Sequence, residues 1–132
     1  MRILCFGDSN TYGFDPRCVM GGRYDEKGRW PEVLGALSGY EVINEGQNAR
    51  TVPHRERDVA LFCDTLKNTA PDLLIIMLGT NELLLGFAPE DALRRMEGLL
   101  NHVPEGIRVM LVAPPAIHKG EWGTEDRIIQ GI

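Results

Sequence analysis

The sequence has little of what disulfide-rich, zinc-binding or membrane-spanning proteins need. Its three cysteines, Cys5, Cys18 and Cys63, are an odd number without a C-x-x-C spacing. This argues against a disulfide framework or a zinc site and favours a reducing, cytoplasmic setting. The longest apolar runs, such as residues 73–78, are far shorter than the roughly 18 residues of a membrane span. We therefore expect neither a metal centre nor a membrane partner.

Positive charge is also scarce. Lys and Arg number 14 against 19 Asp and Glu, which gives a formal net charge of −5, and no basic cluster stands out. Because a phosphate backbone attracts a basic surface and repels an acidic one, we expect no nucleic-acid partner. The sequence contains neither G-x-G-x-x-G nor the phosphate-binding G-x-x-x-x-G-K-[ST] motif. We therefore expect no nucleotide cofactor, and no other cofactor is indicated.

What is present is a regular alternation of short apolar runs and segments with helical periodicity. At 132 residues the chain has room for one domain, residues 1–132. Strands are predicted at residues 3–6, 41–44, 73–78 and 109–112, and helices at 30–37, 55–66 and 89–100. Strand and helix in alternation predict an α/β fold, with three layers, α/β/α, around a parallel, flavodoxin-like sheet. In such sheets ligands bind at the carboxyl ends of the strands.

The last residues interrupt this pattern. Thr124, followed by acidic residues, is typical of a helix N-cap, and the sequence then ends about two turns later at Ile132. A sheet of this kind normally continues through that helix to another strand. We therefore expect a single domain that lacks its C-terminal strand and helix. Since this leaves an open sheet edge and an uncovered apolar face, we also expect a homo-oligomer.

Three polar motifs follow the first three predicted strands, and the parallel topology brings them to one edge. Ser9 stands at a strand-to-helix turn, where a serine is exposed and suits a nucleophile if a base takes its proton. Gly46 can bring a backbone N–H close to a substrate oxygen, and Asn81 offers a side-chain N–H. Acyl transfer requires hydrogen-bond donors that are fixed where negative charge develops on the substrate oxygen. The alternative is that all three are ordinary turn and cap sequences. The motifs are Gly-Asp-Ser-Asn at 7–10, Asn-Glu-Gly-Gln-Asn at 44–48 and Gly-Thr-Asn-Glu at 79–82.

These motifs, in this order, resemble the SGNH hydrolases, also called GDSL esterases, and in particular their short bacterial arylesterase or acyltransferase-like members. The resemblance implies that Ser9 is the nucleophile. It implies an oxyanion hole made by the backbone N–H groups of Ser9 and Gly46 and the side chain of Asn81. It also implies a small-molecule carboxylic ester as substrate, an acyl-Ser9 intermediate, and no metal or cofactor. The matching segments are residues 5–13, 29–31, 44–51 and 72–82.

Two features depart from the family pattern. Glu82 stands where the third motif usually ends in Asp, and the Asp-x-x-His block that supplies the base and its orienting carboxylate is absent from the sequence. His118 follows the fourth strand and His54 follows the Gly46 loop, so either is a candidate substitute base. Without a base, activity should fall by several orders of magnitude. The alternative hypothesis is a non-catalytic binding or interaction module with the same fold.

Overall fold

Four parallel strands form the central sheet, in the order β4-β1-β5-β6. The computed structural model describes residues 1–18 and 20–117 of the chain. The strands of the sheet are β1 (Arg2–Gly7), β4 (Glu41–Gly46), β5 (Leu73–Met77) and β6 (Arg108–Leu111). They confirm the four predicted strands, with ends shifted by one or two residues.

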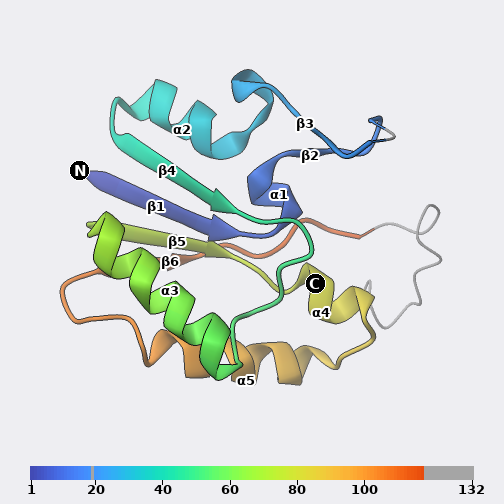
Figure 1. The fold of residues 1–132 in the computed structure, drawn as a ribbon, viewed down its shortest axis with the longest axis vertical. Coiled ribbons are helices and arrows are strands. Elements are labelled where there is room, and N and C mark those ends of the chain that lie inside the picture. Colours follow the sequence, from blue (N-terminus) through green and yellow to red (C-terminus); the bar gives the residue numbers. More distant parts are fainter. Residues whose placement is uncertain (19, 118–132) are drawn as a thin grey trace.

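Three helices cover the sheet from both sides (Figure 1). They are α2 (Trp30–Ser38), α3 (Glu56–Thr69) and α5 (Pro89–Leu100). The helix α2 lies on one face, and α3 and α5 lie on the other. The predicted α/β/α architecture with a parallel sheet is therefore confirmed. The helix expected at 124–132 lies outside the described residues.

Several short elements were not apparent in the sequence pattern, because each is shorter than one full period of a helix or strand signal. The short elements are the helices α1 (Ser9–Tyr12) and α4 (Thr80–Leu84), the 3₁₀ turn η1 (Glu26–Gly28), and an antiparallel ribbon of β2 (Phe14–Asp15) and β3 (Gly22–Arg23).

Among the described residues, no helix has the length and apolar character needed to cross a bilayer.

The two central strands are apolar on both faces because helices cover both faces. On the α3 and α5 side, the rings of Phe6 and Phe62 meet edge to face, with their centroids 5.0 Å apart. On the α2 side, Trp30 packs against a smaller buried cluster that includes Cys5. Burial raises the pKa of the Cys5 thiol to about 12, so this cysteine is an unreactive core residue.

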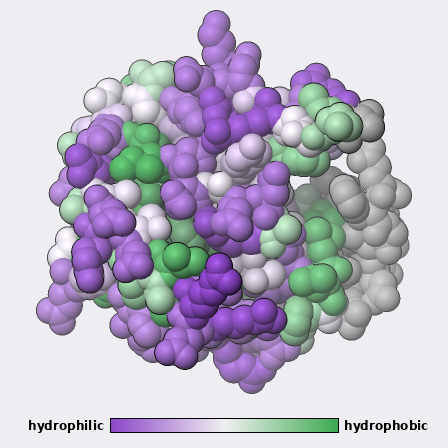
Figure 2. Space-filling model, viewed as in Figure 1, coloured by the Kyte–Doolittle hydropathy of each residue, from purple (hydrophilic) through white to green (hydrophobic). Residues whose placement is uncertain are grey.

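The strand β6 is the least covered part of the sheet. Its side chains alternate between the two faces, and all four are exposed. Among the described residues, no strand pairs with its outer edge. A cavity of about 540 Å³ lies beside it on the α2 side, lined by apolar side chains that include Trp30, Ile75 and Met110. The visible face of the molecule in Figure 2 is mainly hydrophilic, with a few separate apolar areas.

Candidate active site

The register of the sheet brings the three predicted motifs together. Gly7, the last residue of β1, pairs with Gly46 on one side and with Met77 on the other. The three strands therefore end level with one another, and the loops that follow them leave the sheet side by side. Ser9 begins α1 directly after the central strand. Asn81 lies in the first turn of α4. The motifs thus share the carboxyl edge of the sheet, where α/β proteins bind ligands.

The turn that carries Ser9 packs against the ends of β1 and β4 at very short distance. A Cβ added to Gly7 would lie 2.0 Å from Oγ1 of Thr11. A Cβ added to Gly46 would lie 2.1 Å from the backbone nitrogen of Tyr12. Real Cβ atoms do not approach other atoms this closely, so both positions require glycine. The two glycines therefore serve the packing of α1 on the sheet, which sets the position of Ser9.

Ser9 itself is half-buried. The turn is capped by Asp8, whose Oδ1 accepts a hydrogen bond from the Asn10 N–H at 2.9 Å. Among the described residues, the Ser9 N–H donates to no partner, so it is available to a ligand at this edge. The local geometry is that of a strand-to-helix turn presenting a hydroxyl and its own backbone amide.

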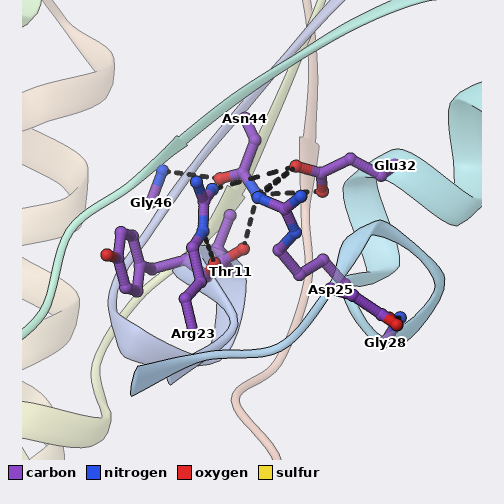
Figure 3. A network of polar contacts seen from close by, with 9 residues as sticks. Thr11, Arg23, Asp25, Gly28, Glu32, Asn44 and Gly46 are labelled. Atoms are coloured by element: carbon purple, nitrogen blue, oxygen red, sulfur yellow. Dashed lines mark hydrogen bonds and ion pairs between the residues drawn. The ribbon is translucent and has the colours of Figure 1, made fainter. Parts of the chain in front are cut away.

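A polar network anchors the other side of α1 (Figure 3). At its centre, Asn44 Nδ2 donates to the Thr11 carbonyl at 2.9 Å and to Glu32 Oε2 at 3.0 Å. Glu32 is 3.2 Å from Arg29 Nη1 and 3.8 Å from Arg23 Nη2. Asn44 and Arg29 lie in segments that resemble the family, but the sequence did not single out Glu32 or Arg23. An isolated charged side chain in a helix or a short strand is too common to identify a site.

The same network affects the predicted donor at Gly46. The Gly46 N–H donates to Oδ1 of Asn44 at 2.9 Å. In this arrangement the amide is engaged within the protein, so it can stabilise an oxyanion only if that hydrogen bond breaks. The role of Gly46 as an oxyanion donor stays a prediction, and the geometry does not favour it.

The loop after β4 also contains a residue in an unusual backbone conformation. Ala49 has φ of 62°, a left-handed conformation that is unusual for a residue other than glycine. Within the described part of the chain, the N–H groups of Asn48 and Ala49 donate to no partner. Strained backbone at a ligand-binding edge points to function, because such conformations persist only where the surroundings enforce them.

Asn81 is half-buried, and its carboxamide is held from the neighbouring loop. Its Nδ2 donates to the carbonyl of Arg50 at 2.8 Å. An amide nitrogen carries two N–H groups, so the second can donate to a bound ligand. Asn81 is thus fixed in orientation while keeping a donor.

Two buried carboxyl groups lie beneath the site. Glu82 is fully buried, accepts a hydrogen bond from the Val52 N–H and lies 3.8 Å from Arg95 Nη1. The longer side chain at this family position therefore anchors the loop at Val52. Burial raises the pKa of Asp8, and the negative charge of Glu82 adds to that effect. Among the described residues, Oδ2 of Asp8 and Oε2 of Glu82 have no hydrogen-bond partner.

Of the two candidate bases, the structure describes only His54, and it lines a cavity that does not include Ser9. His54 is exposed, and its Nδ1 lies 3.0 Å from the Val52 carbonyl. It lines a cavity of about 330 Å³ beside α5 together with Arg94 and His102, and Ser9 is not part of that cavity. His118 lies outside the described residues. In the described part of the chain, no group of three or more His, Cys, Asp or Glu side chains is placed to hold a metal ion.

Comparison with known proteins identifies the family. The model of the GDSL-like lipase/acylhydrolase family matches residues 5–131. The chain belongs to this family. The motifs of this GDSL-like family member at 7–10, 44–48 and 79–82 lie at the carboxyl edge of the sheet, where α/β proteins bind ligands. No curated protein matches the chain.

Solved structures with the same fold include esterases. A carbohydrate acetylesterase family member from Sinorhizobium meliloti is 30% identical, with a TM-score of 0.76 over 89% of this chain and 64% of that one. A candidate arylesterase from Agrobacterium tumefaciens is 29% identical, with a TM-score of 0.77 over 98% of this chain and 74% of that one. AlinE4, an SGNH-hydrolase family esterase, is 28% identical, with a TM-score of 0.60 over 86% of this chain and 60% of that one. This GDSL-like chain therefore spans between 60% and 74% of the length of these three proteins.

Proposed function

We propose that this chain carries the nucleophile and oxyanion donors of a serine esterase that acts on small carboxylic esters. The observation that carries the proposal is the sheet register, in which the Ser9 turn emerges between the loops that follow Gly46 and Met77. Membership of an acylhydrolase family supports it. The proposal needs no metal or cofactor, because the chemistry is a nucleophilic attack assisted by fixed hydrogen-bond donors.

The proposed reaction has two halves. The Ser9 hydroxyl oxygen attacks the ester carbonyl carbon while its proton passes to a base, and a tetrahedral intermediate forms. Its oxyanion accepts hydrogen bonds from the Ser9 N–H, an amide of the loop after β4 and the second Nδ2–H of Asn81. The C–O bond to the alcohol breaks, the alcohol leaves with the proton, and acyl-Ser9 remains. Water, or a second alcohol, then attacks the acyl carbon and gives its proton to the base. The bond between the acyl carbon and the Ser9 oxygen breaks, the base returns the proton to that oxygen, and a carboxylic acid or a new ester leaves.

The identity of the second donor is part of the proposal. Gly46 is the donor that the family resemblance implies, and Ala49 is the donor that the hydrogen bonds favour. The Gly46 N–H is held by Asn44, whereas Ala49 lies three residues further along the same loop with its amide donating to no described residue. We therefore assign this role to Ala49 first and to Gly46 second.

The base is the weakest element of the proposed reaction in this chain. The sequence holds no Asp-x-x-His block, and His54 faces a different cavity. Without a base the Ser9 hydroxyl keeps a high pKa, and oxyanion stabilisation and binding alone leave only about 10³ to 10⁴ of the rate enhancement. We therefore expect slow turnover of activated esters by the 132-residue chain.

Replacing the nucleophile tests the proposal directly. Ser9→Ala should abolish the release of p-nitrophenol from p-nitrophenyl acetate and the labelling of the chain by a fluorophosphonate probe. Ser38→Ala is a matched control, because Ser38 is the only other serine in the sequence and lies at the end of α2. Turnover that is the same in Ser9→Ala as in the unsubstituted chain would show that Ser9 is not the nucleophile.

The second candidate function is a non-catalytic binding module. The absent Asp-x-x-His block favours it, because the donors at the sheet edge would still bind a small anion or carbonyl compound. A module predicts no ester turnover above that of Ser9→Ala, together with acetate binding that Asn81→Ala weakens. Measurable turnover that depends on Ser9 excludes this alternative.

We further propose a reducing, cytoplasmic setting. All three cysteines are free, and only Cys18 is exposed. An exposed free thiol is more compatible with a reducing compartment than with an oxidising one.

A further inference from the structure

One arginine contacts all three loops of the candidate site. The side chain of Arg50 is only 14% exposed. Its Nη1 donates to the Gly7 carbonyl at 3.1 Å and to the Glu45 carbonyl. Its Nη2 donates to Oε1 of Gln47 at 2.9 Å. The guanidinium group lies over the ring of Phe6, 4.1 Å from the ring centroid.

These contacts fold the arginine back onto the start of its own loop. The Arg50 N–H donates to the Gln47 carbonyl at 3.3 Å, and the Gln47 N–H donates to the Gly7 carbonyl at 3.1 Å. The Gly7 carbonyl therefore accepts hydrogen bonds from both the loop backbone and the guanidinium group. Between these fixed points Ala49 holds its left-handed conformation. Strained backbone of this kind relaxes unless neighbouring contacts enforce it, and the Arg50 side chain supplies those contacts.

The backbone of the same residue holds the third loop. The carbonyl of Arg50 is the acceptor for Nδ2 of Asn81, at 2.8 Å. The side chain of Arg50 thus fixes the loop relative to the Ser9 turn, and its carbonyl fixes the Asn81 carboxamide relative to the loop. The guanidinium group is a rigid planar fork of donors spread over several atoms, so it spans two carbonyls and an amide oxygen. The compact ammonium of a lysine would not hold these acceptors in the same geometry.

From this geometry we propose that Arg50 is the positioning residue of the oxyanion site: it aligns the amide of Ala49 and the carboxamide of Asn81 with Ser9. The inference rests on the proposed function, since it assigns how the donors of that reaction are aligned. Arg50 acts through these groups and need not touch the substrate. Misplacing catalytic groups by about 1 Å costs up to about 100-fold in rate.

The first test follows the Asn81 side chain and needs no catalysis. In ¹H–¹⁵N spectra, the Asn81 side-chain amide signals are assigned by their loss in Asn81→Asp. Arg50→Lys should shift these signals and leave those of Asn101, at the end of α5, in place. The control Arg57→Lys makes the same chemical change at an exposed arginine of α3. Asn81 signals that are unmoved in Arg50→Lys would overturn the proposal, whether or not the chain hydrolyses esters.

The second test separates positioning from a general loss of stability. With p-nitrophenyl acetate, Arg50→Lys should lower kcat about 10- to 100-fold and change KM little, because the donors act on the transition state. In an Asn81→Ala background the same substitution should cost much less, because one aligned donor is already missing. Equal losses in both backgrounds would contradict positioning through Asn81. Failure of the proposed function has a different signature, namely turnover that survives Ser9→Ala.

Discussion

At the scale of single residues, contact distances decide which side chains the site tolerates. Gly7 and Gly46 both face the turn that carries Ser9. Each faces the backbone or side chains of the α1 turn at a separation that leaves no room for a methyl group. Gly98, in the last turn of α5, faces open space, with no atom within 4 Å apart from those of its own helix backbone and chain neighbours. The same substitution should therefore have opposite effects at these positions.

Gly46→Ala should destabilise the fold by about 1–3 kcal/mol, because its methyl group would meet the backbone of Tyr12 and push α1 from the sheet. Gly98→Ala should instead stabilise the protein by up to about 1 kcal/mol, since alanine has a higher helix propensity than glycine. Urea denaturation of both variants measures the two free energies of unfolding. A Gly46→Ala protein as stable as the unsubstituted chain would mean that α1 is not packed against β4 as described.

Asp8 makes stability depend on pH. Its pKa in the folded state is raised above the ordinary value of 3.8, chiefly by burial and also by the charge of Glu82. The folded state therefore holds the Asp8 proton more tightly than the unfolded state does. The resulting stability is present below the unfolded pKa and is lost as the pH rises through the folded pKa.

Asp8→Asn should therefore gain stability relative to the unsubstituted protein as the pH increases from about 4 to about 7. The asparagine keeps an oxygen that can accept the Asn10 N–H, so the cap of α1 is retained. Denaturation of both proteins at a series of pH values gives the difference in free energy of unfolding. A difference that is constant with pH, or that falls, would show that burial does not raise the pKa of Asp8.

At the scale of elements, the sequence predicted the strands and their common edge but not the hydrogen bonds that decide the donors. Continuous apolar runs identified β5 and β6, and parallel topology alone placed the motifs after β1, β4 and β5 together. The ribbon of β2 and β3 was not predicted, because strands of two residues have no periodicity. The engagement of the Gly46 N–H was not predictable either, because it depends on the rotamer of Asn44.

The role of Arg50 was hidden for the same reason. In the sequence it is one arginine beside a turn, and its position between two carbonyls is set by tertiary packing on Phe6. Element-level patterns thus identify which loops meet. They do not identify which polar group within a loop is satisfied and which remains available to a ligand.

At the scale of the whole molecule, the helices cover the sheet unequally. The central strands β1 and β5 are buried, whereas Val109, Met110 and Leu111 of β6 are 39%, 49% and 53% exposed. Among the described residues, nothing pairs with the outer edge of this strand. Exposed edges with apolar side chains favour pairing with another chain, and proteins usually protect them.

We therefore predict that the chain self-associates through β6. Met110→Lys places a charge on the exposed apolar face and should shift sedimentation velocity profiles towards the monomer, because a charge in a buried contact is costly. Met20→Lys is the control, since Met20 is 96% exposed and lies in the loop between β2 and β3, a ribbon that does not pair with the central sheet. It should leave the distribution unchanged. A stable monomer of the unsubstituted chain at high concentration would contradict the prediction, and a response to Met20→Lys alone would move the interface to the ribbon.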